Sequence, residues 1–397
     1  MLDNIKNKNI SFKEPNLEKY IDNYIDKLHL SSDIKYGINT SDIIVITIGT
    51  SIKNGMPLMD NLWNLIDEIL NCSIKNKLFI FKTTLPLNTI EKIKNIFEEN
   101  TDLTADKDFY ISFCPERVVE GKIIEELKSL PKVIGGIGPI STELTKNFIK
   151  PLGGKIIIVK NPQTAEFIKL MDNSFRITLF GFSNDLTYIS SKNDIDIYEA
   201  IDAANENYSR NNIPYPSCGV GGYCLTKDPY YLEQSFHDYG IERGFFSTWF
   251  YARESCNHKI EYITKIISNT LESKNIPIKQ ANVLICGITY KENIDDTRDS
   301  HGLLYAKNLF KEGAKIQIWD PYANKENIDY KIIREKERAF IDQDLAFFTV
   351  KHDTFLELRK KDNFEKILKL MRNKIIIDGW GIFNDYKFNK DIEYIQV

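Results

Sequence analysis

Strand and helix signals alternate in the first and last thirds of the chain, and this alternation restricts the fold more than any other feature. The strand signals are short apolar runs rich in β-branched residues, and they fall at 42–48, 78–83, 109–113, 281–286, 315–319, 344–349 and 374–378. Such runs are typical of strands buried on both faces of a parallel sheet. Because helical patterns separate them, the sequence predicts two α/β regions with parallel, doubly wound sheets.

The middle third is helical. Asn161-Pro162 is typical of an N-cap followed by proline in the first turn, and helical periodicity then continues to about Asn205. A second helical pattern covers 245–274, and an earlier one covers 16–30. A chain of 397 residues is too long for one core. We therefore expect three domains: an α/β domain at 1–160, a helical connector at 161–275 that could also form a dimer interface, and a second α/β domain at 276–397.

Composition, charge and cysteine spacing exclude several classes of protein. A net charge of −4 argues against a general nucleic-acid or anionic-membrane binder. The six cysteines form no CxxC pair and have no histidine at metal-ligand spacing, so we expect reduced thiols and no metal site. The N-terminus lacks the apolar core of a signal peptide, and no apolar run is long enough to span a bilayer. These features predict a cytoplasmic protein.

The segment from Gly219 to Asp228, GVGGYCLTKD, is the strongest local signal. Glycines permit close approach of a ligand to the backbone, and Cys224 follows them directly. A cation such as Lys227 favours the thiolate that a nucleophile needs. The alternative is a glycine turn before a helix that happens to hold a cysteine. Spacing alone fits both interpretations.

Three other segments carry candidate site residues. Lys169 and Asn173 share one helix face at i and i+4, although a solvated polar face has the same spacing. Ligands in open α/β sheets bind beyond the carboxyl ends of strands. Three sets of polar residues follow strand signals in this sequence and could lie at such a position. They are Thr84, the Glu116–Glu120 segment, and the basic residues Lys291 and Arg298. Surface positions are the common alternative for each.

Taken together and in this order, these segments resemble the UDP-glucose/GDP-mannose dehydrogenase family, and the resemblance covers nearly the whole chain. The matching pieces are Glu14–Leu17, Lys82–Pro86, Cys114–Arg117, Lys169–Asn173, Gly221–Cys224 with Lys227-Asp228, Thr289–Lys291 and Asp296–Arg298. The resemblance implies an NAD-binding Rossmann-like domain at 1–160, a dimerising helical connector with catalytic residues at 161–275, and a Rossmann-like nucleotide-sugar-binding domain at 276–397. It implies NAD-dependent, four-electron oxidation of the C6 alcohol of a UDP-sugar for polysaccharide precursor synthesis, by a homodimer.

The resemblance also implies roles for individual residues. Cys224 would be the nucleophile that forms a thiohemiacetal and then a thioester, and Lys169 and Asn173 would stabilise the oxyanion. Asp228 and Thr84 would position or activate water, and Glu120 is a candidate base for thioester hydrolysis. The remaining candidates would bind substrate (Glu116, Arg117, Lys291, Gly221, Gly222 and Tyr223) or NAD (Thr84, Arg298 and Lys227).

The identity of the sugar stays open, and a second group of enzymes shares part of the pattern. The run CPERVVEGK at 114–122 is more similar to UDP-N-acetylmannosamine dehydrogenases than to UDP-glucose dehydrogenases, so we expect a UDP-N-acetylhexosamine, with UDP-glucose as the alternative. The β-hydroxyacid and 6-phosphogluconate dehydrogenases also place Lys and Asn four residues apart, but they need neither Cys224 nor a second Rossmann-like domain.

The sequence departs from the family at its start and at two smaller points. No G-x-G-x-x-G follows a strand signal, so we expect a first domain truncated at its N-terminus. Either the chain begins at an internal methionine of a longer enzyme, or it is an inactive, NAD-deficient nucleotide-sugar binder. Ser217-Cys218 replaces a frequent Pro-Gly, and Trp380 stands where relatives often carry arginine.

Overall fold

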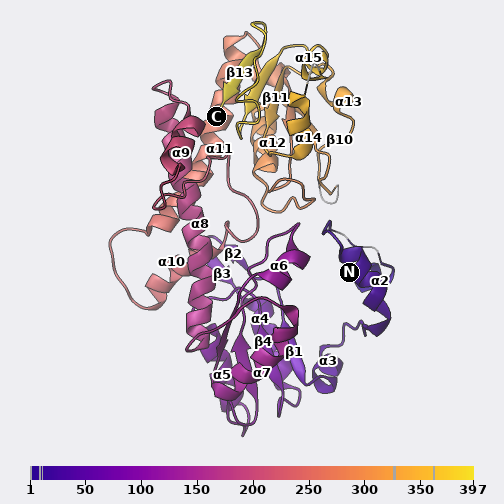
Figure 1. The fold of residues 1–397 in the computed structure, drawn as a ribbon, viewed down its shortest axis with the longest axis vertical. Coiled ribbons are helices and arrows are strands. Elements are labelled where there is room, and N and C mark those ends of the chain that lie inside the picture. The colour runs from indigo at the N-terminus through magenta and orange to yellow at the C-terminus, as the bar shows by residue number, and fades with distance from the viewer. Residues whose placement is uncertain (1, 9, 11, 325–327, 361–362) are drawn as a thin grey trace. The chain divides into compact units, whose positions relative to one another are not determined.

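The computed structural model describes residues 2–8, 10, 12–324, 328–360 and 363–397, which form two compact units (Figure 1). Unit 1 comprises Met1–Ser174 and Lys227–Phe245, and unit 2 comprises Phe175–Thr226 and Phe246–Val397. Each unit is built around one larger sheet with helices, so the expected α/β class with Rossmann-like sheets is confirmed.

The main sheet of unit 1 has the strand order β1-β4-β5-β6-β7. Its strands are β1 (Ile43–Ile46), β4 (Leu78–Phe81), β5 (Tyr110–Phe113), β6 (Lys132–Gly136) and β7 (Ile156–Ile158). The pairs are parallel except β5 with β6, which is antiparallel, so the sheet is mixed rather than wholly parallel as expected. β1 ends the sheet, and Ile43 and Val45 on it are 39% and 40% exposed.

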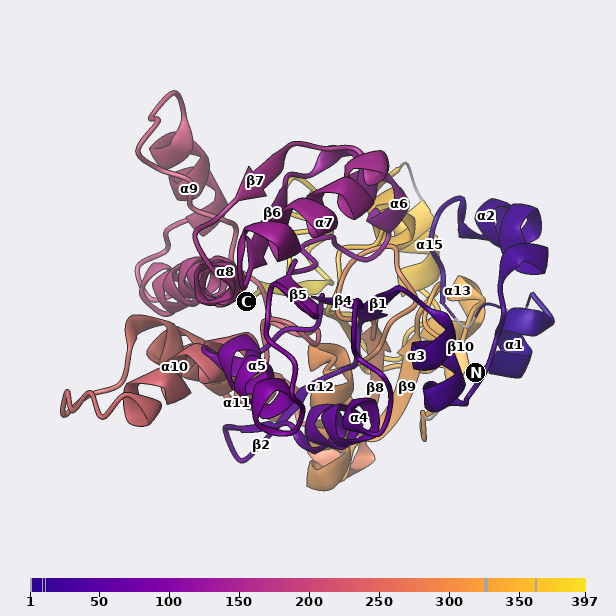
Figure 2. The same cartoon turned by 90° about the horizontal axis from the view of Figure 1, so that it is seen from below.

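Alternate residues of these strands face two apolar layers. Phe79 and Phe81 pack with α4 (Asp60–Leu70) and α5 (Thr89–Glu99), whereas Leu78 and Ile80 belong to the cluster that includes Ile149 of α7 (Pro139–Ile149). Figure 2 shows α4 and α5 on one side of this sheet and α7 on the other. Period-two alternation with two covered faces explains why the strands are apolar throughout.

A hairpin of β2 (Ser51–Lys53) and β3 (Met56–Leu58) was not expected from the apolar pattern. Its turn residues Asn54 and Gly55 both have positive φ, 53° and 76°, as a type I′ turn requires. The Asn-Gly pair was therefore the signal for it. The hairpin contacts α10 (Asp228–Asp238), where the Tyr231 hydroxyl donates to the carbonyl of Ser51 at 2.9 Å.

Several helices of unit 1 begin without a side-chain hydrogen bond from their own N-cap residue, among them α5, α6 (Ile123–Ser129) and α7. In these three, carboxylates distant in sequence accept the first N–H groups instead, which satisfies donors that a helix start leaves open. The pairs are Glu166 with Asn88 N at 2.7 Å and Ile90 N at 2.9 Å, Asp106 with Ser141 N at 2.6 Å and Ile140 N at 3.1 Å, and Glu14 with Gly121 N at 2.9 Å and Ile124 N at 3.4 Å.

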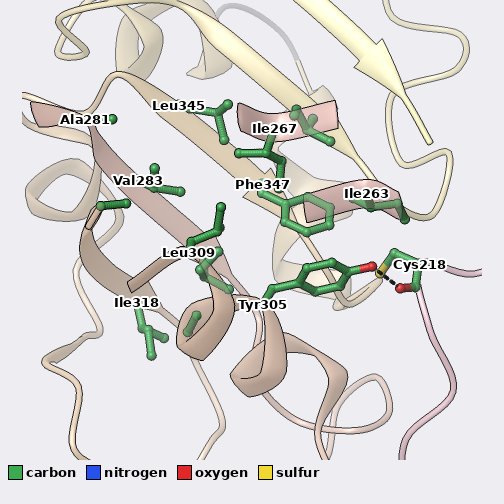
Figure 3. Close-up of a cluster of buried hydrophobic side chains, with 14 of the residues drawn as sticks. Cys218, Ile263, Ile267, Ala281, Val283, Tyr305, Leu309, Ile318, Leu345 and Phe347 are labelled. Atoms are coloured by element: carbon green, nitrogen blue, oxygen red, sulfur yellow. Dashed lines mark hydrogen bonds between the residues drawn. The ribbon is translucent and has the colours of Figure 1, made fainter. Parts of the chain in front are cut away.

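The main sheet of unit 2 has the order β10-β9-β8-β11-β12-β13, and all its pairs are parallel. The strands are β8 (Asn282–Cys286), β9 (Lys315–Trp319), β10 (Ile332–Ile333), β11 (Leu345–Phe348), β12 (Ile375–Asp378) and β13 (Glu393–Gln396). One face packs on α11 (Thr248–Ser273) and α12 (His301–Glu312), as Figure 3 shows for Val283, Phe347 and Tyr305. The other face is covered by α13 (Lys336–Phe340), α14 (Asp353–Leu356) and α15 (Asn363–Leu368).

The expected long helix ends earlier than predicted. α8 covers Pro162–Ser190, and a turn with Asp194 at φ 55° separates it from α9 (Ile197–Asn205), whose N-cap Asp196 accepts from Tyr198 N and Glu199 N. On α8, Gly181 lies against Ala252 of α11. The helix expected at 16–30 is also shorter: α2 is Leu17–Tyr24, between α1 (Leu2–Lys6) and α3 (Ile34–Thr40).

Candidate active site

Unit 1 brings together three predicted site residues from two helices. The Asn173 carboxamide on α8 donates to Asp228 Oδ2 at 2.6 Å, although 55 residues separate the two. Lys227 Nζ lies 2.7 Å from Asp228 Oδ1. All three side chains are buried. Both oxygens of the carboxylate are therefore engaged, and the charged pair is fixed where α10 begins.

Glu116 and Lys169 form a second group in unit 1. Lys169 Nζ donates to the carbonyl of Glu116 at 2.7 Å. The Glu116 carboxylate lies 3.0 Å from Lys82 Nζ and accepts from Arg117 N at 2.9 Å and Val118 N at 3.2 Å. Burial alone would raise the pKa of this carboxyl, but the Lys82 ammonium and the two backbone donors hold it below its ordinary value.

The remaining candidates of unit 1 lie at strand ends. Arg117 Nη1 pairs with Asp172 Oδ2 on α8 at 3.1 Å, and its Nη2 donates to Pro131 O at 2.9 Å. Thr84 is half-buried just after β4, and its carbonyl accepts from Thr50 Oγ1 at 2.9 Å. Glu120 is half-buried in the loop that Glu14 holds through Gly121.

Sequence reasoning missed two residues that shape this part of the site, Lys82 and Glu14. Lys82 neutralises Glu116, and Glu14 fixes the loop that contains Glu120. Both lie in segments that carry the family resemblance, so their membership of those segments was the available signal. Their contacts are tertiary, and no spacing rule relates Glu14 to Gly121.

Cys224 belongs to unit 2 and differs from the other cysteines there in exposure. It is exposed, whereas Cys218, Cys256 and Cys286 are buried. Burial raises the pKa of those three thiols, that of Cys218 to about 12. Because the thiolate is the nucleophile, the buried thiols are poor candidates for covalent chemistry. Accessibility thus favours Cys224.

The other candidates of unit 2 have the following contacts. The Arg298 guanidinium lies 5.5 Å from the centre of the Tyr223 ring and also pairs with Asp296 at 2.6 Å. A Cβ on Gly222, whose φ is 86°, would lie 2.6 Å from Tyr290, and one on Gly221 would lie 2.6 Å from Asp299 O. Lys291 is half-buried, and its carbonyl accepts from Thr289 Oγ1 at 2.7 Å.

Within the residues that the structure describes, no group of three or more histidine, cysteine, aspartate or glutamate side chains is arranged to hold a metal ion. In the same residues, no helix combines the length and apolarity needed to cross a bilayer.

Family models match three consecutive parts of the chain. Residues 1–152 match the NAD binding domain of the UDP-glucose/GDP-mannose dehydrogenase family, 163–255 its central domain and 284–385 its UDP binding domain. The NAD-binding match begins at residue 1, so the expected truncation of the first domain is not confirmed.

Individual proteins give the same result. The chain is 28% identical to a UDP-N-acetyl-D-mannosamine dehydrogenase of Pyrococcus horikoshii over 94% of this chain and 85% of the relative. It is 30% identical to one of Campylobacter jejuni, over 80% and 79%. The solved P. horikoshii UDP-D-ManNAc dehydrogenase has a TM-score of 0.88 at 26% identity, covering 100% of this chain and 90% of that one. The Staphylococcus aureus UDP-N-acetyl-mannosamine dehydrogenase has a TM-score of 0.83 at 26% identity, covering 100% and 89%.

Proposed function

The chain belongs to the UDP-glucose/GDP-mannose dehydrogenase family, and from this premise we propose that it oxidises the C6 alcohol of a UDP-N-acetylhexosamine to the carboxylate through a thioester on Cys224. It is an NAD-dependent nucleotide-sugar dehydrogenase with the family's NAD-binding and UDP-binding domains. The observation that carries the thioester proposal is an exposed thiol three residues before the buried Lys227–Asp228 pair in the chain.

The covalent step divides a four-electron oxidation into two two-electron oxidations. The alcohol first becomes an aldehyde, and addition of the Cys224 thiolate gives a thiohemiacetal whose oxidation yields the thioester. Water then releases the carboxylate and returns the thiol. Each oxidation removes one hydride and one proton, so two NAD⁺ are consumed per sugar.

Two residues of unit 1, Lys169 and Asn173, suit the oxyanion that develops at C6. The Lys169 ammonium has three N–H donors, and the bond to Glu116 O takes one of them. Asn173 has two, of which Asp228 takes one. Donors held in place before the reaction stabilise charge without reorganisation, which is the basis of an oxyanion hole. We assign Asp228 and Thr84 to water positioning and Glu120 to thioester hydrolysis.

The carboxyl ends of the strands in the unit 1 sheet are the part of the structure where we expect NAD to bind. Thr84 is half-buried just after the carboxyl end of β4, and its carbonyl accepts from the buried Thr50 hydroxyl at 2.9 Å. Dinucleotides bind beyond the carboxyl ends of strands in open α/β sheets. NAD, when bound there, supplies the hydride acceptor. We assign Thr84, Lys227 and Arg298 as cofactor contacts on the resemblance.

The identity of the sugar rests on the relatives. The proteins named above are UDP-N-acetylmannosamine dehydrogenases, and this supports UDP-N-acetylmannosamine over UDP-glucose as the substrate. We assign its contacts to Glu116, Arg117, Lys291, Gly221, Gly222 and Tyr223. A role in polysaccharide precursor synthesis rests on the family resemblance alone.

The test measures NADH formed by the purified chain with UDP-N-acetylmannosamine and with UDP-glucose. Two NADH per sugar, lost in Cys224→Ala and retained in the control Cys72→Ala, are expected. Undiminished NADH formation by Cys224→Ala would refute the thioester. A folded chain that binds UDP-sugar but forms no NADH would identify the NAD-deficient binder.

Three further assignments extend this proposal. Exposed apolar residues recur on α8 at near-heptad spacing, namely Phe167, Met171, Phe175, Phe182 and Ile189, and they support a homodimer formed along this helix. Light scattering on Phe175→Lys, with dissociation expected, tests the dimer. All six cysteines are free, which supports a cytoplasmic location. Domain boundaries near 160 and 275 are supported by the three family matches.

A further inference from the structure

The loop that precedes Cys224 is buried although it has no regular structure. Residues 216–222 are all buried, and the chain emerges only at half-buried Tyr223 and exposed Cys224. Buried backbone outside helices and sheets must find other hydrogen-bond partners for its N–H and C=O groups. The identity of these partners shows what fixes the loop.

Side chains supply partners for one N–H group and three consecutive carbonyl groups of the loop. Ser217 N donates to Asn184 Oδ1 at 2.8 Å, and the Tyr305 hydroxyl donates to the carbonyl of Cys218 (Figure 3). The Ser217 hydroxyl donates to Gly219 O at 3.0 Å, and Arg253 Nη1 donates to Val220 O at 2.8 Å. The anchors come from α8, α12 and α11, and burial raises the pKa of the Tyr305 hydroxyl, so it remains a donor.

One backbone carbonyl just after β11, that of Thr349, also contacts the loop. Thr349 O accepts from Cys218 Sγ at 3.3 Å and from Trp380 Nε1 at 2.7 Å, and it lies 2.6 Å from His301 Nε2. Cys218 and Trp380 are two of the three residues, with Ser217, at which a departure from the family pattern is expected from the sequence. These two residues meet at one acceptor.

Two glycines, Gly219 in the loop and Gly379 beside it, allow close packing between the loop and its surroundings. A Cβ on Gly219 would lie 2.9 Å from His301 Cβ, and a Cβ on Gly379 would lie 2.6 Å from Cys218 Cβ. Real Cβ atoms essentially never approach other atoms this closely, so each glycine backbone lies directly against a neighbouring side chain. Glycine-rich segments are otherwise the most mobile parts of a chain.

We propose that Tyr305, Arg253 and Asn184 are positioning residues that hold the backbone of residues 217–220 and thereby fix where Cys224 presents its thiol. The proposal rests on the proposed function of Cys224. None of the three needs to touch substrate. Their effect is on the fraction of time for which the thiol lies within reach of the aldehyde, because a displacement of about 1 Å costs roughly 100-fold in rate.

Tyr305→Phe tests the proposal because it removes one oxygen and keeps the ring, which packs 4.8 Å from Phe347, centre to centre. The matched control is Tyr394→Phe. The Tyr394 hydroxyl bonds Asp378 Oδ2 at 3.0 Å, and its ring packs with the apolar cluster on the other face of the sheet. Steady-state kinetics, UDP affinity and hydrogen exchange of the 217–222 peptide are measured for both.

Tyr305→Phe is expected to lower kcat about 10- to 100-fold, to leave UDP affinity within about twofold, and to speed exchange of the loop peptide at least about tenfold. Tyr394→Phe is expected to change kcat less than about twofold. Unchanged kcat together with unchanged exchange in folded Tyr305→Phe would overturn the proposal. Equal losses of kcat in both variants would also overturn it, because they would show a general stability effect.

If Tyr305→Phe fails to fold, Ser217→Ala tests the proposal instead. It removes the bond from the Ser217 hydroxyl to Gly219 O at 3.0 Å and the longer bond that this hydroxyl accepts from Asn184 Nδ2 at 3.5 Å. Faster exchange with lower kcat supports the proposal, and no change in either overturns it. Failure of the proposed function looks different: Cys224→Ala would then retain activity, whereas loop exchange in Tyr305→Phe would still report whether the anchor exists.

Discussion

Two helical glycines, Gly181 and Gly37, have opposite surroundings and predict opposite effects of the same substitution. A Cβ on Gly181 of α8 would lie 2.5 Å from Ala252 Cβ, 2.7 Å from its Cα and 2.9 Å from its carbonyl on α11. A Cβ on Gly37 of α3 would meet nothing within 4 Å. Alanine favours a helix over glycine by about 1 kcal/mol at either position.

The contacts decide the sign at Gly181. Carbon atoms pack at roughly 3.5–4.0 Å, so alanine there must push α8 and α11 apart by about 1 Å. Such overpacking costs about 1–3 kcal/mol, more where backbone must move, which exceeds the gain in helix propensity. We expect Gly181→Ala to lower the free energy of unfolding by about 1–2 kcal/mol. Gly37→Ala is expected to raise it by about 0.5–1 kcal/mol.

Urea unfolding followed by circular dichroism measures both changes. The double variant Gly181→Ala/Ala252→Gly relieves the Cβ contact and should recover part of the loss, which a double-mutant cycle quantifies. A stabilised Gly181→Ala would refute the inferred helix contact. An additive cycle would show that Ala252 is not the residue responsible.

Three further predictions concern single side chains. Burial raises the pKa of Glu166 to about 8, so the unfolded chain holds fewer protons than the folded one between pH 4.5 and 8. The free energy of unfolding should therefore fall as the pH rises through that range, by up to about 1.4 kcal/mol per pH unit. Glu166→Gln should flatten this part of the pH dependence of the urea midpoint. Val45→Lys should slow aggregation in light scattering by charging an exposed edge strand, with little loss of stability. Iodoacetamide should label Cys224 before Cys286 in peptide mass spectrometry, and the reverse order would contradict the burial described above.

Much of the fold could be predicted because its strands are apolar over their whole length. The 281–286 run became β8, and the 78–83 run became β4. The antiparallel pairing of β5 with β6 could not be predicted, since strand direction follows from the path of the chain and leaves no periodicity in the sequence. The break after Ser190 depends on Asp196 capping α9, a local signal that helical periodicity concealed.

Part of the candidate site could also be predicted from the sequence, and part of it could not. Lys169 and Asn173 share a helix face, so their spacing indicated a pair. The bond from Asn173 to Asp228 joins residues 55 apart, and only the folded chain reveals it. Lys82 shows a further limit, because a lysine beside a strand end has no distinguishing pattern until its partner Glu116 is located.

The remote caps on three helices bear on how the protein is made at the ribosome. The carboxylate that completes the start of α5 is Glu166, 78 residues after the Asn88 amide it receives. A ribosome that adds about 5–20 residues per second needs roughly 4–16 s to cover that interval. During this time the emerging α5 segment has an open end and an apolar face without its final neighbours. Slower codons between the two segments would lengthen the interval, so we expect soluble yield to depend on the codons chosen there.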